Sequence, residues 1–244
     1  MTRRIYRLTG KDARHFLQGL ITNDIRGVDQ GLVYTAMLTP QGKYIADFFL
    51  LADGDAILLD VDAGIGPALV QRLSMYKLRS DVQIAETDLK LARGTGPAPD
   101  GALPDPRHPD LGWRLYGDRD GDDGTDWDAI RVAHCIPETG IELTPDTFIL
   151  EAGFERLHGV DFRKGCYVGQ EVTARMKHKT ELRKGLVRVI LDGEAPAGTE
   201  ITADGKPAGT LHTRAGDAGI AYLRLDRATG PMQAGQARVT LADS

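Results

Sequence analysis

The sequence has few of the features that mark a secreted, membrane or metal-binding protein. It contains only two cysteines, Cys135 and Cys166, and neither stands in a C-x-x-C pair or a Cys/His spacing that closes a metal site. We therefore expect no disulfide framework, no resident metal, and two reduced thiols in the cytoplasm. No apolar run approaches the ~18 residues of a membrane span. The basic N-terminus is not followed by the apolar stretch of a secretory signal, so we expect no membrane association.

The chain also has little excess charge, and the basic residues are unevenly distributed. The net charge of −5 argues against general nucleic-acid binding. Between residues 163 and 188, however, eight basic residues face two glutamates, which makes this segment +6 and the remainder −11. The eight are Arg163, Lys164, Arg175, Lys177, Lys179, Arg183, Lys184 and Arg188. We call this segment the basic strip; it is either a solvated surface or a site for an anionic ligand or partner.

The first three quarters of the chain mix helical and strand-like patterns. Apolar spacing predicts helices over residues 12–22 and 64–78. Alternating or continuous apolar runs predict strands over 32–38, 44–51, 55–61 and 81–86, and Pro40-Gln41-Gly42 supplies the turn of a hairpin. No βαβ rhythm is present, so the fold class expected is α+β with mixed or antiparallel sheets.

From residue 186 onward, short apolar runs alternate with Gly, Pro and Asp, which is typical of a small β-barrel. We therefore expect a first domain over residues 1–180 and a C-terminal barrel over 181–244. Residues 94–109 contain five prolines, and residues 117–126 are rich in Gly and Asp. Both stretches are expected to be exposed loops.

Cys166 has the surroundings of a reactive thiol. Two cations, Arg163 and Lys164, come just before it, and such charges stabilise a thiolate. Gly165 and Gly169 would allow a ligand or another backbone to approach closely. The alternative is that Cys166 is buried as a small apolar side chain, and the residues alone leave both readings open.

One segment resembles a known family. Residues 164–171, Lys-Gly-Cys-Tyr-Val-Gly-Gln-Glu, are followed by Arg175 and match the signature K-G-C-Y-x-G-Q-E of the YgfZ family of folate-binding proteins, which includes mitochondrial iron-sulfur assembly proteins. Residues 16–19 (FLQG), 22–24 (TND) and 34–38 (YTAML) resemble the start of the T-protein of the glycine cleavage system, an aminomethyltransferase to which that family is related. Residues 150–153 (LEAG) look like the stretch that carries the T-protein's folate-binding glutamate.

This resemblance implies a T-protein-like folate-binding fold, tetrahydrofolate as the cofactor, and a supporting role in iron-sulfur cluster assembly. The implied partners are iron-sulfur assembly or client proteins, among them radical tRNA-modifying enzymes. Cys166, Asp47 and Lys164 are the residues implied in the chemistry. The residues implied in folate binding are Asp47, Glu151, Tyr34, Gln170 and Arg175.

The resemblance leaves a second activity open, that of a true aminomethyltransferase. Against it stand the short chain, a cysteine motif that T-proteins do not need, and a single Asp47 where T-proteins often have two adjacent aspartates. One cysteine also cannot hold a cluster that typically takes four ligands, so any cluster would be shared with a partner.

The patterns alone leave three roles undecided. Asp47 either reaches solvent at a sheet edge or is held by hydrogen bonds in a cleft, since an unpaired buried carboxylate is costly. Glu151 either pairs with a pterin or is a favourable charge at a helix N-terminus. Tyr34 either stacks on a ligand or fills the core. Cys135 and His134 are expected to be structural, although relatives often have glycine where this chain has Cys135.

Overall fold

The computed structural model describes residues 2–178 and 182–242. The chain divides into two compact units. The first unit comprises Met1–Thr125 and Phe154–Ala174, and the second comprises Asp126–Gly153 and Arg175–Ser244. The predicted domain boundary at residue 180 lies outside the described residues, so that division stays a prediction.

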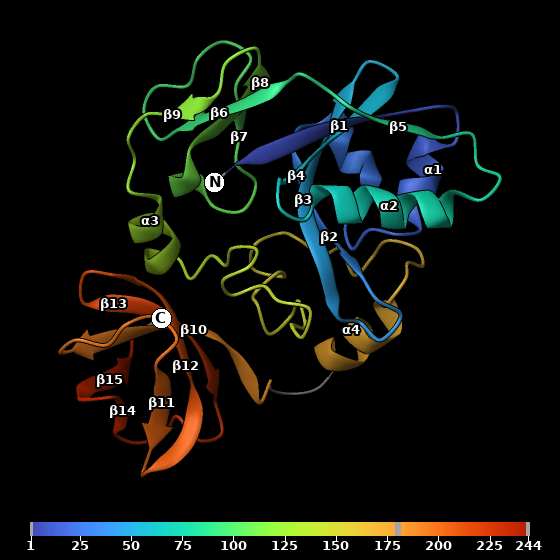
Figure 1. The fold of residues 1–244 in the computed structure, drawn as a ribbon. Coiled ribbons are helices and arrows are strands. Elements are labelled where there is room, and N and C mark those ends of the chain that lie inside the picture. Colours follow the sequence, from blue (N-terminus) through green and yellow to red (C-terminus); the bar gives the residue numbers. More distant parts are fainter. Residues whose placement is uncertain (1, 179–181, 243–244) are drawn as a thin grey trace. The chain divides into compact units, whose positions relative to one another are not determined.

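A five-stranded antiparallel sheet forms the centre of the first unit (Figure 1), with the order β2-β3-β4-β1-β5. The strands are β1 (Arg3–Thr9), β2 (Val33–Leu38), β3 (Tyr44–Asp53), β4 (Ala56–Asp62) and β5 (Gln83–Glu86). Helices α1 (Ala13–Gln18) and α2 (Gly66–Lys77) bury Leu17, Leu69 and Leu73 in one core cluster with Phe48 and Leu50 of β3. Since neighbouring residues of a strand point to opposite faces, Asp47 and Phe49 lie on the other face of the sheet.

The predicted hairpin and its flanking elements are confirmed. Strands β2 and β3 pair with Tyr34 opposite Phe49 and Ala36 opposite Asp47. The turn between them is closed by a hydrogen bond from Gly42 N to Thr39 O, and Gly42 has φ +76°, a conformation that glycine adopts without strain. Strand β1 carries no alternation that sets it apart in the sequence, and it was not predicted.

A second, four-stranded sheet in the first unit corrects one expectation. Its order is β7-β8-β6-β9, with β6 (Lys90–Gly94), β7 (Leu103–Pro104), β8 (Trp113–Gly117) and β9 (Gly121–Asp122). Residues 95–101 are exposed as expected. The remainder of the 94–109 stretch is not a simple surface loop, because it forms β7 and buries Asp105. Composition did not reveal this, since the charged residues there are buried as ion pairs.

The second unit contains the barrel that the sequence predicts. Six strands close in the order β10-β13-β12-β11-β14-β15. They are β10 (Lys184–Asp192), β11 (Glu200–Ala203), β12 (Lys206–Ala215), β13 (Ala218–Arg224), β14 (Met232–Ala234) and β15 (Ala237–Leu241). Only the short β14 was not expected. Helix α3 (Trp127–Ala133) packs Val132 against Ile220 of the barrel. The α+β class and the small barrel are therefore confirmed.

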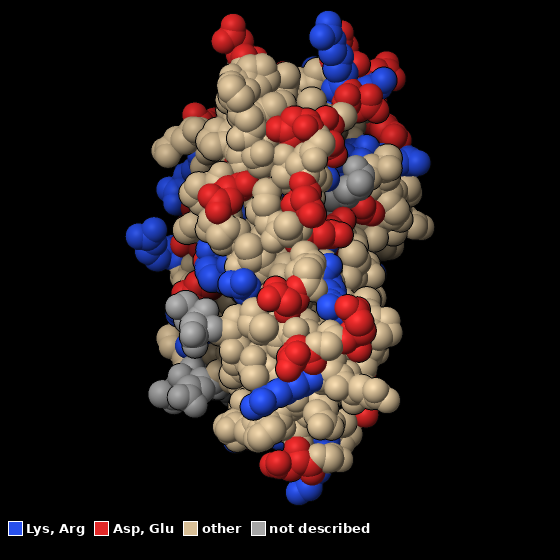
Figure 2. Space-filling model, turned by 90° about the vertical axis from the view of Figure 1, so that its left-hand side faces the viewer, with Lys and Arg blue, Asp and Glu red and all other residues tan. Residues whose placement is uncertain are grey.

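Three further elements complete the described chain. Two short 3-10 helices, η1 (Ile25–Asp29) and η2 (Pro109–Leu111), lie in the first unit. Helix α4 (Gln170–Lys177) begins with the last two residues of the cysteine motif. None of the helices among the described residues is long and apolar enough to cross a membrane. On the face drawn in Figure 2, acidic and basic side chains are interspersed.

Candidate functional site

The loop that carries Cys166 is attached to the segment that follows α1. Asp161 N donates to Thr22 O at 3.1 Å, and Val168 N donates to Gly19 O at 3.2 Å. Between these two attachments, Cys166 is exposed. The structure thus joins two motifs that are about 140 residues apart in the sequence, and it excludes the reading of Cys166 as a buried apolar side chain.

Lys164 adds two further bonds to this attachment. Its Nζ donates to Gln18 O at 2.7 Å and to Ile21 O at 2.5 Å, and it lies 4.9 Å from the centre of the Tyr167 ring. Burial lowers the pKa of Lys164 to about 8, although the carboxylates of Asp24 and Asp161 oppose this shift. Lys164 is two residues before Cys166 in the sequence, but its ammonium is hydrogen-bonded to the backbone carbonyls of Gln18 and Ile21.

The start of α4 fixes the other end of the loop. Gln170 Oε1 accepts a hydrogen bond from Tyr167 N at 3.1 Å. Gly169 has φ +86°, and a Cβ there would lie 2.6 Å from Thr39 O in the β2–β3 turn. The glycine of the motif thus permits a close backbone approach. Arg175 is exposed on α4.

Asp47 is held by two tyrosine hydroxyls. Tyr34 Oη donates to Asp47 Oδ2 at 3.0 Å, and Tyr44 Oη donates to Asp47 Oδ1 at 2.7 Å. The Asp47 residue is only 5% exposed, and β3 lies between β2 and β4, so the reading of Asp47 as a solvated edge residue is excluded. Sequence reasoning missed Tyr44, and its place three residues before Asp47 on a strand gave no signal of this contact.

Tyr34 fills the core with its ring. The ring is stacked on Phe154 at a centroid distance of 5.1 Å and lies 5.2 Å from the Phe49 ring. Burial, and then the charge of Asp47, raises the pKa of Tyr34 well above its usual value, so the phenol remains a hydrogen-bond donor. The sequence left open whether the Tyr34 ring stacks on a ligand or fills the core, and its packing against Phe49 and Phe154 matches the core role. Its hydroxyl contacts the candidate site residue Asp47.

A buried chain of ion pairs borders Tyr34 and Phe49, and it was not foreseen. The order is Arg107, Asp105, Arg114, Asp60 and Arg3, with closest N–O distances of 2.7, 3.4, 2.6 and 2.6 Å along the chain. All three guanidinium groups lie within 6 Å of the Phe49 ring centre. Burial opposes ionisation, but the two arginines beside Asp60 hold its pKa at about 2.

In the second unit, Glu151 has its own tyrosine. Tyr222 Oη in β13 donates to Glu151 Oε2 at 2.7 Å, and Leu186 N in β10 donates to the Glu151 carbonyl at 2.8 Å. Burial, followed by the hydrogen bond to Glu151, raises the pKa of Tyr222. Residues 151–158 are turns, so Glu151 is not a helix N-terminal charge. Of the folate-binding candidates, Asp47 belongs to the first unit, and Glu151 and Arg175 belong to the second.

The second cysteine has a structural setting. Cys135 follows the α3 C-cap residue His134, has φ +49°, and packs against the cluster of Val132 and Ile220. Left-handed φ after a helix end favours glycine, and this chain has Cys135 there. The two cysteines also differ in exposure, since Cys135 is half-buried and Cys166 is exposed.

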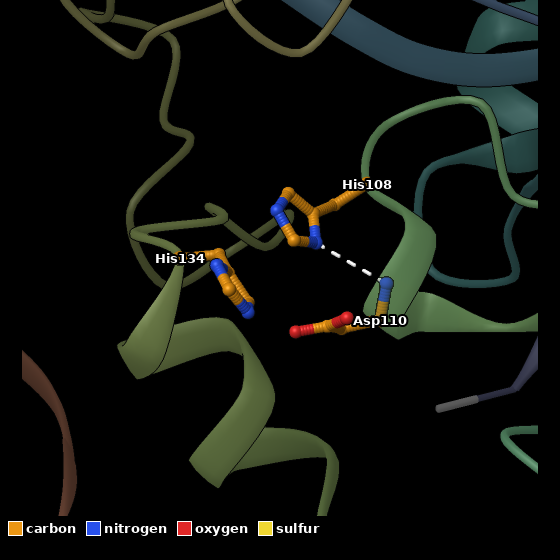
Figure 3. Close-up of side chains that lie close together, drawn as sticks. All are labelled: His108, Asp110 and His134. Carbon is orange, nitrogen blue, oxygen red and sulfur yellow. Dashed lines mark hydrogen bonds between the residues drawn. The ribbon is translucent and has the colours of Figure 1, made fainter.

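Two histidines are also drawn in close-up in Figure 3. In the first unit, His108 Nδ1 accepts a hydrogen bond from Asp110 N at 3.2 Å, which caps η2. His134 belongs to the second unit, where it ends α3. His108 and His134 thus serve the ends of two separate helices, η2 and α3.

Comparison with known proteins identifies the family. Residues 183–244 match the family described as CAF17, C-terminal beta-barrel domain. Over 278 residues, the chain is 31% identical to the mitochondrial iron-sulfur cluster assembly factor IBA57 of Mus musculus, covering 94% of this chain and 78% of the mouse protein. The chain belongs to the IBA57/CAF17 family of iron-sulfur cluster assembly factors. The YgfZ-type resemblance read from the cysteine motif is thereby confirmed.

Other relatives agree with this assignment. The IBA57 homologue of Neurospora crassa is 34% identical over 247 residues, which cover 84% of this chain and 55% of the fungal protein. Among solved structures, the glycine cleavage system aminomethyltransferase T of Bartonella henselae superposes with a TM-score of 0.77 over 99% of this chain and 83% of that chain. Its 13% identity shows a shared fold only, so the T-protein-like fold is confirmed and the transferase activity is not carried over.

Proposed function

We propose that this IBA57/CAF17 family member supports iron-sulfur cluster assembly or repair in client enzymes, with Cys166 as its functional thiol and tetrahydrofolate as its cofactor. The single observation that carries the proposal is that Cys166 is exposed on a loop whose two sides are hydrogen-bonded to residues 18–22. A thiol presented in this way can reach a cluster or a thiol on a partner. Because a cluster typically takes four ligands, a partner would supply the others.

The chemistry of two carboxylates supports tetrahydrofolate binding. A pterin presents its 2-amino group and a ring N–H side by side, and a carboxylate accepts both. In this proposal Glu151 accepts this pair of donors, and Asp47 contacts the folate near its reactive nitrogens. Each carboxylate is oriented by tyrosine hydroxyls. In this proposal Tyr34 acts through its hydroxyl at Asp47. Gln170 and Arg175 contribute from α4, and the basic strip receives a polyglutamylated folate tail or an acidic partner surface.

Complementation tests the thiol. A strain lacking the native protein receives the wild-type chain, Cys166→Ser or the control Cys135→Gly, and the activities of several cluster-containing enzymes are measured together with protein abundance. We expect wild-type and Cys135→Gly to restore these activities and Cys166→Ser to fail at equal abundance. Full restoration by Cys166→Ser would remove the thiol from the proposal.

Calorimetric titration with tetrahydrofolate under anaerobic conditions tests the cofactor separately. We expect saturable heat for the wild-type protein and weaker binding for Asp47→Ala and Glu151→Ala. An absence of heat and of thermal stabilisation in the wild-type protein would leave a cluster-assembly protein that has the fold without the folate.

Aminomethyl transfer is the second candidate, favoured by the fold shared with aminomethyltransferase T. An assay with a lipoyl-bound aminomethyl substrate decides this point, and substantial turnover would promote it over the first proposal. The cytoplasmic location expected from two reduced thiols stays a prediction, since the names of the IBA57 relatives place those proteins in mitochondria.

A further inference from the structure

We propose that Lys164 is a positioning residue, whose ammonium fastens the Cys166 loop to the end of α1, and not a group that reacts. This inference rests on the proposed function in one respect: it takes the presentation of Cys166 as the purpose of the loop. It departs from the role in the chemistry that the family resemblance implied for Lys164.

Hydrogen bonds hold the chain on both sides of Cys166. The residue lies between two attachments, the Lys164 side chain on Gln18 O and Ile21 O, and the Val168 backbone on Gly19 O. The three acceptors belong to four consecutive residues at the end of α1. Only residues 165–167 lie between the attachments, so this short arch is fixed at both ends.

The acceptors of the Lys164 ammonium are of the kind that a lysine side chain commonly binds. The last carbonyls of a helix have no partner within the helix, and a lysine side chain is a common donor to them. Lys164 donates to Gln18 O, the carbonyl of the last residue of α1, and to Ile21 O, three residues beyond the helix. The face of the Tyr167 ring lies 4.9 Å from the same nitrogen. The carboxylates of Asp24 and Asp161 add favourable charge nearby. An amine acting as a nucleophile or a base would need its lone pair free, which requires giving up the proton of this arrangement.

The competing interpretation is that Lys164 reacts as a nucleophile or a base. A half-buried lysine with a lowered pKa is also what a nucleophilic lysine looks like. The two readings differ in what arginine can do at this position. A guanidinium stays protonated and cannot attack an electrophile, yet it donates several hydrogen bonds and can serve the same carbonyls.

Amide hydrogen exchange in Lys164→Met, Lys164→Arg and the wild-type protein tests the fastening directly. The reporters are the amides of Asp161 and Val168, which donate to Thr22 O and Gly19 O. The amide of Leu50 in β3, a fully buried residue, reports whether the first unit is folded. The control is Lys177→Met, which removes an exposed lysine of the same basic strip.

We expect Lys164→Met to lower the protection of the Val168 amide by at least tenfold while that of Leu50 is kept, and Lys164→Arg to stay within about threefold of wild type. Unchanged protection in Lys164→Met would overturn the proposal. If Lys164→Met loses the protection of the Leu50 amide, Lys164→Gln replaces it, because the glutamine NH2 group keeps N–H donors without a charge. The protection of the Val168 amide in Lys164→Gln should lie between that in Lys164→Met and that in Lys164→Arg. Protection of this amide equal to that in the wild-type protein would again overturn the proposal.

Complementation distinguishes a positioning lysine from a reactive one, because the two roles predict different cluster-enzyme activities for Lys164→Arg. We expect Lys164→Arg to restore most of the cluster-enzyme activity and Lys164→Met to restore little. An inactive Lys164→Arg with a protected Val168 amide would assign Lys164 a reactive role and overturn the proposal. The exchange result does not use cluster chemistry or folate, so it stands even if Cys166→Ser complements fully, an outcome that would remove only the proposed function of the thiol.

Discussion

Tyr222 donates a hydrogen bond from its hydroxyl to Glu151 Oε2 at 2.7 Å, and this arrangement has a counterpart in the first unit. There, the hydroxyls of Tyr34 and Tyr44 donate to the two oxygens of Asp47. Both carboxylates that the T-protein resemblance links to folate are thus oriented by tyrosines. A neutral phenol fixes the direction of a carboxylate without neutralising it, which suits the folate contacts proposed for these two groups.

The Tyr222 hydrogen bond gives the first prediction. Tyr222→Phe should weaken tetrahydrofolate binding by about three- to tenfold, because the loss of one hydrogen bond that orients an acceptor corresponds to roughly 1 kcal/mol. Glu151→Ala should weaken binding more. The measurement is calorimetric titration with tetrahydrofolate, with Tyr76→Phe in α2 as a matched control. Wild-type affinity in Glu151→Ala would remove this carboxylate from the folate site.

Tyr44 gives the second prediction, and it concerns a residue that the sequence did not point to. Tyr44→Phe removes the 2.7 Å hydrogen bond to Asp47 and leaves one oxygen of a 5%-exposed carboxylate with less support. We expect the free energy of unfolding to fall by about 1–3 kcal/mol and folate affinity to fall with it. Urea denaturation and the same titration measure the two effects. If neither quantity changes, the tyrosine is not supporting Asp47.

The outlines of the fold could be read from the sequence because they depend on local patterns. The β2–β3 hairpin combines apolar strands with a turn that needs Gly42, and the barrel strands are separated by Gly, Pro and Asp. The stretch around Asp105 and Arg107 was misread for a physical reason. Its composition is that of a loop, and its burial depends on ion pairs with Arg114, which belongs to another strand.

The candidate site was foreseen only in part for the same reason. The cysteine motif identified Cys166 and Lys164, but the acceptors of Lys164 lie at Gln18 and Ile21, more than 140 residues earlier. Backbone carbonyls carry no sequence signal, so no pattern could have predicted that contact. Likewise, Tyr222 meets Glu151 because Leu186 of β10, which donates to the Glu151 carbonyl, lies opposite Tyr222 in the β10–β13 pair. The position of Tyr222 in a strand gave no hint of this contact.

The third prediction concerns the buried ion pairs and their dependence on pH. Asp60 is fully buried between Arg3 and Arg114, so Asp60→Asn should lower the free energy of unfolding at pH 7 by about 3–5 kcal/mol. Both guanidinium groups lose the carboxylate that lies between them, and Arg114 retains its longer, 3.4 Å ion pair with Asp105. The pKa of Asp60 is about 2 in the folded protein, against 3.8 for an unperturbed aspartate. The unfolded chain therefore binds the proton first as pH falls, and the stabilisation present above pH 4 is lost on the way to pH 2.

Urea denaturation of wild type and Asp60→Asn at several pH values measures this effect. The gap between the two proteins should narrow by about 2 kcal/mol from pH 5 to pH 2, the equivalent of the shift in pKa. Glu86→Gln is the control, because its ion pair with Arg4 is exposed and should contribute no more than about 1 kcal/mol. A gap that stays constant with pH would show that Asp60 is not held ionised by its arginines.

The fourth prediction compares two glycines of the cysteine motif, which differ in backbone conformation and in surroundings. At Gly169, φ is +86° and an added Cβ would lie 2.6 Å from Thr39 O, a backbone atom, whereas a Cβ at Gly165 would meet nothing within 4 Å. Gly169→Ala should therefore lower the free energy of unfolding by about 2 kcal/mol, from left-handed strain and the displaced backbone. Gly165→Ala should stay within about 0.5 kcal/mol of wild type. Urea denaturation measures both. Equal stabilities would mean that α4 does not approach the β2–β3 turn as closely as the structure shows, and the attachment of the Cys166 loop on that side would then be looser than its hydrogen bonds indicate.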